Sequence, residues 1–207
     1  MNHDATAHRQ LERLMLFCDA VFAIAITLLV LEIKVPEMHH PTEQSLLQTL
    51  ADLLPKLVGF VFSFLVVGSY WTRHHQLFAF LRGWDERLLG SHLRLLLCVS
   101  FLPFPTAFFS EYPASHTALV LYAASLCLLG LAAYHISHQL LTLPGLLDPT
   151  APLPRLRWLA RRMLVAPVMS GLAIALSWAS LPAARLALTL IPVAVLVTAW
   201  LGRRATR

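Results

Sequence analysis

Long apolar stretches recur along this chain, separated by polar segments too short to form a soluble domain. Six stretches of roughly 20 residues or more consist mainly of aliphatic and aromatic side chains. A helix of about 20 apolar residues crosses the roughly 30 Å of hydrocarbon in a bilayer. Only 13% of the residues are charged, whereas a typical soluble domain has about 25%. The sequence therefore predicts an all-α membrane protein with six transmembrane helices.

These helices are expected to form a single transmembrane domain over residues 1–207. The expected bounds are about 11–35, 46–71, 88–109, 116–143, 158–180 and 183–201. Pro103 and Pro105 should bend or end the third helix, because proline removes a backbone donor and clashes with the preceding turn. The first apolar run contains Asp19 and lacks a small-residue cleavage site, so we expect it to be a mature membrane helix rather than a signal peptide.

The basic residues are distributed unevenly along the chain. All but three of the 16 lie before the first helix, around the second and fourth connections, or in the tail with Arg203, Arg204 and Arg207. Lysine and arginine are enriched in cytoplasmic loops of membrane proteins. The pattern predicts that both termini are cytoplasmic, which requires an even number of spans. It also explains the net charge of +5 without a nucleic-acid partner.

The first helix carries an acidic residue inside its apolar run. Asp19 lies about one turn into the helix, where an ionised carboxylate facing lipid would be costly. It should therefore face protein or water and have a partner, and His74, His75 and Arg94 are candidates on the same side. Two roles remain open for Asp19: a lock between helices, or a part in gating or an ion pathway.

An apolar stripe follows Asp19 on the same helix. Ile24, Leu28 and Leu31 are spaced i, i+4 and i+7 and share one face, with Thr27 beside them. The spacing alone favours packing against another helix. The alternative is a pore lining, in which rings of apolar side chains gate ion flow by dewetting.

The run from Tyr70 to Phe78 places aromatic residues beside basic ones, as is typical of a membrane interface. His74 and His75 are adjacent and point to different faces of a helix. They are a poor chelating pair, and a hydrogen-bond network at the end of the first helix is favoured. His135 and His138 have no evident third ligand, so they are interpreted as interfacial.

The cysteines lack zinc-binding spacing and are expected to be reduced and buried: Cys18, Cys98 and Cys127.

Signatures of common catalytic sites do not occur in this sequence. The GxxxxGK[ST], HExxH and GxSxG motifs are absent, as is the TVGYG run of potassium-selectivity filters. We therefore expect no enzyme activity, no cofactor and no resident metal.

The run from Arg13 to Pro36 resembles the helix 1 signature, Arg-x-x-x-Phe-Ser-Asp, of bacterial relatives of the lysosomal potassium channel called transmembrane protein 175. The segment Tyr70-Trp71-x-x-His74-His75 looks like the end of helix 2 in that family. The motifs cover roughly the first 80 residues. At the position of the motif serine this chain has Cys18, whose thiol is a weak donor. Any hydrogen bond made by that serine should be weaker here.

The resemblance implies a potassium-permeable channel of a bacterial inner membrane, assembled as a homotetramer around helix 1. It implies that Ile24, Leu28 and Leu31 form stacked apolar constriction rings, and that Thr27 is the hydroxyl layer favouring potassium over other monovalent cations. It also implies a network that anchors helix 1 in the lipid bilayer: Arg13, Phe17, Cys18, Asp19, Trp71, His74 and His75.

Two other functions remain open from the residues. One is an ion-coupled secondary transporter that uses Asp19 as its coupling site, although paired broken helices in two halves are not evident. The other is a non-conducting membrane scaffold in which the first helix only packs. The oligomeric state and the helix on its axis would separate the three functions.

Overall fold

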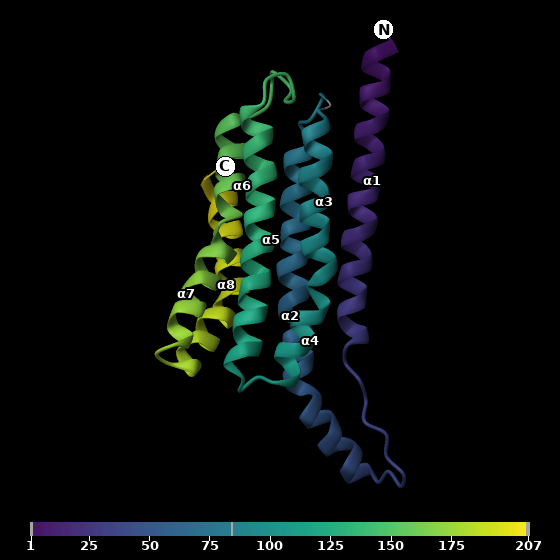
Figure 1. Ribbon diagram of the computed structural model, residues 1–207, viewed down its shortest axis with the longest axis vertical. Coiled ribbons are helices and arrows are strands. Elements are labelled where there is room, and N and C mark those ends of the chain that lie inside the picture. Colours follow the sequence, from purple (N-terminus) through teal and green to yellow (C-terminus); the bar gives the residue numbers. More distant parts are fainter. Residues whose placement is uncertain (1, 84, 206–207) are drawn as a thin grey trace.

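A computed structural model describes residues 2–83 and 85–205 of the chain, and this part is all-helical. Its helices are α1 (Asn2–Leu31), α2 (Glu43–Phe78), α3 (Glu86–Phe101), α4 (Pro103–Glu111), α5 (His116–Thr142), α6 (Leu153–Arg162), α7 (Val165–Ser177) and α8 (Leu181–Ala205) (Figure 1). The all-helical membrane architecture expected from the sequence is confirmed.

Two of the expected spans are each built from a pair of helices. The apolar span 86–111 breaks at Leu102 into α3 and α4, and the span 153–177 breaks after Arg162 into α6 and α7. Pro103 is the first residue of α4. Proline is tolerated there because the N–H of the first helical residue makes no hydrogen bond within the helix. Five described segments are long and apolar enough to cross a membrane, and a shorter apolar helix spans Leu181–Val195.

Several helix ends differ from those expected. α1 begins before residue 11 and ends at Leu31, four residues before Val35, while α2 continues beyond Trp71 to Phe78. α6 begins at Leu153 rather than near Trp158. The apolar composition indicates only where a helix leaves the hydrocarbon. Backbone hydrogen bonds can continue the helix beyond that point into polar sequence. The extension of α2 places His74 and His75 within a helix.

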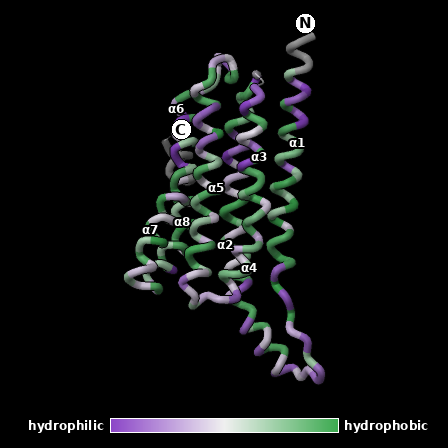
Figure 2. Tube along the Cα trace, viewed as in Figure 1, coloured by the Kyte–Doolittle hydropathy of each residue, from purple (hydrophilic) through white to green (hydrophobic). Residues whose placement is uncertain are grey.

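The helices form one elongated bundle with α1 at an edge (Figure 1). α1 packs against α2, α3 and α4, while α5 lies between α3 and α7. Apolar residues dominate the middle of the helices, and hydrophilic residues gather at the start of α1 and in the loop between α1 and α2 (Figure 2). α1 thus keeps one long side that the rest of its own bundle does not cover.

The connections α2–α3 and α5–α6 lie at the same end of the bundle as the N-terminus (Figure 1). They are joined by backbone hydrogen bonds from Arg82 and Gly83 to the Leu146 carbonyl, at 2.9 and 3.1 Å, and from Asp148 to the Phe80 carbonyl at 2.9 Å. Arg82 also pairs with Asp148 at 2.5 Å. The two connections therefore act as one structural unit.

The Asp148 carboxylate is held within this joined pair of loops. It accepts hydrogen bonds from the Thr150 backbone at 2.8 Å and from the Thr150 hydroxyl at 2.6 Å. These bonds, followed by the charge of Arg82, lower the pKa of Asp148 from its ordinary value. The arginine-rich connections meet at this end of the bundle, whereas Arg207 of the basic tail lies outside the described residues.

Candidate functional site on α1

α1 presents two faces of opposite environment. Its buried face follows the helical period of 3.6 residues and packs on the bundle: Leu11, Leu14, Cys18, Phe22, Ala25 and Leu29. The side chains on the opposite face are exposed. The helix is therefore held along one stripe and uncovered along the other.

The stripe singled out in the sequence lies on the uncovered face. Ile24, Leu28 and Leu31 are 58%, 40% and 69% exposed, respectively. Among the described residues no other helix buries this stripe. The packing favoured by spacing alone would therefore need a helix of another chain. Such an apolar surface in a membrane protein is covered by lipid or by another copy of the chain.

Thr27 adds a hydroxyl to this uncovered face. Its Oγ1 donates to the Ile24 carbonyl at 2.8 Å, with the Ala23 carbonyl at 3.1 Å. Because a hydroxyl has one donor and two acceptor lone pairs, this bond leaves the oxygen free to accept. Thr27 therefore presents acceptor oxygen in an otherwise apolar stripe.

A side-chain hydrogen bond attaches α1 to α2. The indole Nε1–H of Trp71 donates to the Asp19 carboxylate at 2.8 Å, and the Trp71 ring stacks on His75 with 5.8 Å between centroids. The donor is thus Trp71 and not Arg94, which was one of the three candidate partners. Arg94 projects toward α5, where it lies 3.3 Å from His135.

The members of the expected anchoring network occupy different environments. Cys18 and His74 are buried in the bundle, and Asp19 is half-buried. Arg13 and Phe17 are exposed on α1. The structure therefore brings Trp71 together with Asp19 and His75, brings Cys18 together with His74, and leaves the first two residues of the motif facing outward.

A second set of hydrogen bonds attaches α2 to the break between α6 and α7, through residues whose roles the sequence did not reveal. The Tyr70 hydroxyl donates to the Met163 carbonyl at 3.1 Å, and the Arg73 guanidinium donates to the Arg162 carbonyl at 3.2 Å. These carbonyls lie at the break between α6 and α7, where the last turn of a helix leaves backbone acceptors unsatisfied. A buried arginine within an apolar helix was the available signal, since it requires partners.

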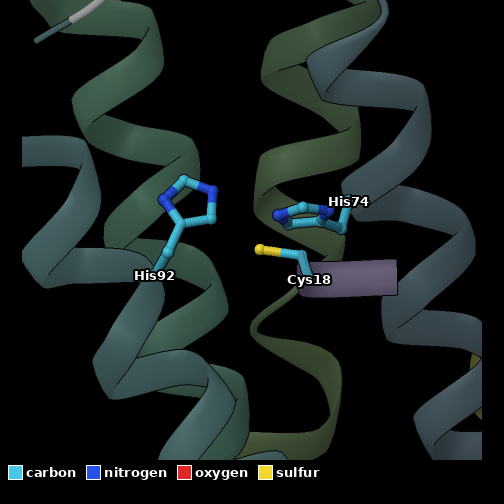
Figure 3. A group of neighbouring side chains, drawn as sticks. All are labelled: Cys18, His74 and His92. Atoms are coloured by element: carbon cyan, nitrogen blue, oxygen red, sulfur yellow. The ribbon is translucent and has the colours of Figure 1, made fainter. Parts of the chain in front are cut away.

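A buried cluster joins α1, α2 and α3 (Figure 3). The ligand atoms of Cys18, His74 and His92 all lie within 4.8 Å of one another. His92 was missed in the sequence because the three residues come from three helices and have no recognisable spacing. Cys98 and Cys127 are partly exposed, contrary to the expectation of burial, because they lie nearer the surface of the bundle.

The other end of α1 opens onto a charged cavity of about 560 Å³. Its lining includes Glu32 and Lys34, together with Lys56 and Glu111, which form an ion pair at 2.5 Å. The cavity lies on the side of the bundle opposite the arginine-rich connections. Charged side chains thus gather next to the end of the exposed stripe.

Comparison with known proteins connects this arrangement to a family. The family model described as endosomal/lysosomal potassium channel TMEM175 matches residues 13–103. A protein from Streptomyces collinus, named a potassium channel, is 35% identical over 174 residues, which cover 82% of this chain and 84% of that protein. The chain belongs to the TMEM175 family. The family expected from the α1 and α2 motifs is confirmed.

Solved structures of TMEM175 proteins have the same fold. A TMEM175 homologue from Chamaesiphon minutus, described as a lysosomal potassium-selective channel homologue, superposes with a TM-score of 0.78 at 28% identity, covering 91% of this chain and 97% of that one. A variant of the potassium channel MtTMEM175, bound to a nanobody fusion, gives a TM-score of 0.64 at 20% identity, covering 94% and 93%. The family is described as ion channels, in agreement with the expectation that the chain is not an enzyme.

Proposed function

We propose that this protein is a potassium-permeable channel whose conduction path follows the uncovered face of α1 in a homotetramer. The observation that carries the proposal is that this face, with its apolar stripe and single hydroxyl, is left exposed by the part of the chain that the structure describes. The relatives from S. collinus and C. minutus are described as potassium channels, which supports potassium as the permeant ion.

Four copies of α1 around an axis would turn these faces toward one another. Ile24, Leu28 and Leu31 would then form three apolar rings about one turn of helix apart, and rings of this kind gate by dewetting. Ions would cross largely hydrated when the rings widen. The free acceptor of Thr27 would lie between the first two rings and favour potassium.

The attachments of α1 support this orientation. Its opposite face is buried, and the hydrogen bond between Trp71 and Asp19 restrains its rotation relative to α2. Because α1 is packed along one face, it cannot rotate freely, and its opposite face keeps a fixed orientation. The anchoring network would therefore determine how wide the constriction is.

The charge distribution supports an orientation in a bacterial inner membrane with both termini in the cytoplasm. The arginine-rich connections lie at one end of the bundle with the N-terminus (Figure 1), as the enrichment of basic residues in cytoplasmic loops predicts. Glu32, Glu37 and Glu43 are exposed near the opposite end. These carboxylates would raise the local cation concentration at the outer mouth.

The test is potassium flux through purified protein in liposomes, compared with Ile24→Asn. A polar side chain at the constriction favours wetting, so we expect the variant to increase flux at least severalfold and to weaken the preference for potassium over sodium. Leu97→Asn is the matched control, because Leu97 is an exposed aliphatic residue on α3, away from the α1 stripe. Its flux should equal that of the unmodified protein.

Absence of potassium flux would contradict the channel assignment. Equal flux and selectivity in Ile24→Asn and the unmodified protein would contradict the pore assignment of the stripe. Saturable uptake coupled to protons, without unitary currents, would favour a transporter instead. Disulfide crosslinking of Leu28→Cys into species of four chains is the expected evidence for the tetramer.

A further inference from the structure

Three side chains able to ligate a metal converge in the core between α1, α2 and α3. In Figure 3 the Cys18 sulfur and the two imidazole rings point into one common space. Cys18 and His92 are 0% exposed and His74 is 4% exposed, and the ligand atoms lie within 4.8 Å of one another. The cluster is distinct from the uncovered face of α1, because Cys18 lies on the buried side of that helix.

The imidazole nitrogens in this cluster lack the partners that buried polar atoms usually have. Both ring nitrogens of His74 and Nε2 of His92 have no hydrogen-bond partner among the described residues. Buried side-chain polar atoms are paired in the large majority of cases. The two rings instead contact Phe78, at 4.3 Å from His74 and 4.8 Å from His92 between centroids.

The hydrogen bond of His92 determines which of its nitrogens is available. Nδ1 lies 2.6 Å from the Leu88 carbonyl oxygen, which can only accept, so Nδ1 carries the proton. In a neutral imidazole the other nitrogen, Nε2, then has its lone pair free. A histidine whose second nitrogen donates to a backbone carbonyl is the usual arrangement of a metal ligand.

We propose that Cys18, His74 and His92 bind a soft d10 metal ion, with Cu⁺ preferred over Zn²⁺. Thiolate and imidazole are the ligands that such ions prefer. On binding, the Cys18 thiol loses its proton to solvent as the metal–sulfur bond forms. One thiolate, two neutral imidazoles and Cu⁺ give a neutral site, whereas Zn²⁺ would leave a net positive charge in apolar surroundings, which is unfavourable.

The number of ligands also favours Cu⁺. Three protein ligands satisfy Cu⁺, whereas zinc sites are almost always four-coordinate. With metal–ligand bonds of about 2.0–2.3 Å, three ligand atoms in a plane lie roughly 3.5–3.8 Å apart. Because the ligand atoms already lie within 4.8 Å of one another, each separation would shorten by at most about 1.3 Å, a change that side-chain rotations can provide.

Position 18 supplies a matched control. The TMEM175 motif that the chain resembles has serine where this chain has cysteine, so Cys18→Ser keeps the size and helical context while removing the soft ligand. The same substitution separates metal binding from simple packing of a small side chain between two neutral imidazoles. His138→Gln serves as a control for surface binding, because His138 is exposed on α5.

The experiment uses the full chain in detergent, with Cys98 and Cys127 replaced by alanine so that Cys18 is the single thiol. Cu⁺ is supplied anaerobically in the presence of a chromogenic Cu⁺ chelator, and Zn²⁺ in a parallel titration. We expect one Cu⁺ per chain, a thiolate-to-copper absorption band in the ultraviolet, and a raised melting temperature. Cys18→Ser and His92→Gln should weaken Cu⁺ binding at least 100-fold, and His138→Gln should leave it unchanged.

Three results would overturn the proposal: no Cu⁺ binding, binding by Cys18→Ser as tight as by its parent, or retention of Zn²⁺ in preference to Cu⁺. Size-exclusion chromatography of each variant monitors folding. If His92→Gln does not fold, Cys18→Ser still decides the question. The readout is binding and not ion flux, so the result is independent of whether the protein conducts potassium.

Discussion

Replacing Trp71 by phenylalanine removes the indole N–H that donates to Asp19 and keeps an aromatic ring beside His75. The bond is 2.8 Å long and joins α1 to α2. A hydrogen bond to a charged group contributes about 1.5–3 kcal/mol in soluble proteins, whereas side-chain bonds between membrane helices average about 0.6 kcal/mol. Because Asp19 is half-buried and Trp71 is partly exposed, we expect a coupling of about 1 kcal/mol, or about fivefold in the unfolding equilibrium.

A double-mutant cycle measures this coupling. The variants are Trp71→Phe, Asp19→Ala and the double variant, each unfolded reversibly in mixed detergent–SDS micelles and followed by circular dichroism. The interaction energy is the difference between the effect of the double variant and the sum of the single effects, and for a stabilising bond the double-variant effect is smaller than that sum. Trp178→Phe is the matched control, since Trp178 is exposed after the end of α7. The effects of Trp178→Phe and Asp19→Ala on the free energy of unfolding should be additive in the double variant.

Additivity of Trp71→Phe and Asp19→Ala, to within about 0.3 kcal/mol, would refute the role of this bond in holding α1. A second readout is potassium flux. If the bond restrains the pore-facing helix, the single variants should change flux in the same direction, and the double variant should add little to either one.

Two further changes test the packing and the loops. A Cβ on Gly130 would lie 2.3 Å from Pro167 and 2.5 Å from the Tyr70 hydroxyl, so Gly130→Ala should destabilise the protein by about 1–3 kcal/mol, measured as a lower melting temperature. Asp148 has a lowered pKa in the folded protein because of Thr150, so its contribution to stability is present above the unfolded pKa of about 3.9 and is lost as the pH falls through the folded value. Asp148→Asn should therefore lower the melting temperature at pH 7, and this effect should shrink as the pH falls below about 3.9. An effect of constant size over this pH range would contradict the prediction.

The positions of the membrane helices were predictable because each must bury about 20 apolar residues in hydrocarbon. Their ends were less predictable, as α1 and α2 show. Polar residues before Leu11 and after Trp71 continue these helices, since leaving the hydrocarbon does not oblige a helix to end. The prolines at 103 and 105 correctly indicated the break between α3 and α4.

The candidate site was predictable only in part. A charged residue within a membrane span requires a partner, and this reasoning identified Asp19 as a site residue. It did not identify the partner, which is the Trp71 indole, whereas the candidate Arg94 projects toward α5. His92 is an ordinary histidine in the sequence, and its meeting with Cys18 and His74 depends on the packing of three helices.

The sequence by itself determined that the chain is a helical membrane protein, because hydrocarbon admits only backbone that bonds internally. Its motifs determined the family. Only the tertiary structure decided the direction of each side chain of α1. Periodicity defines a stripe, but a stripe of Ile24, Leu28 and Leu31 looks the same whether it is buried or uncovered. The burial of Cys18, Phe22 and Leu29 against the rest of the bundle settles that question, because a helix that buries one face must present the opposite one.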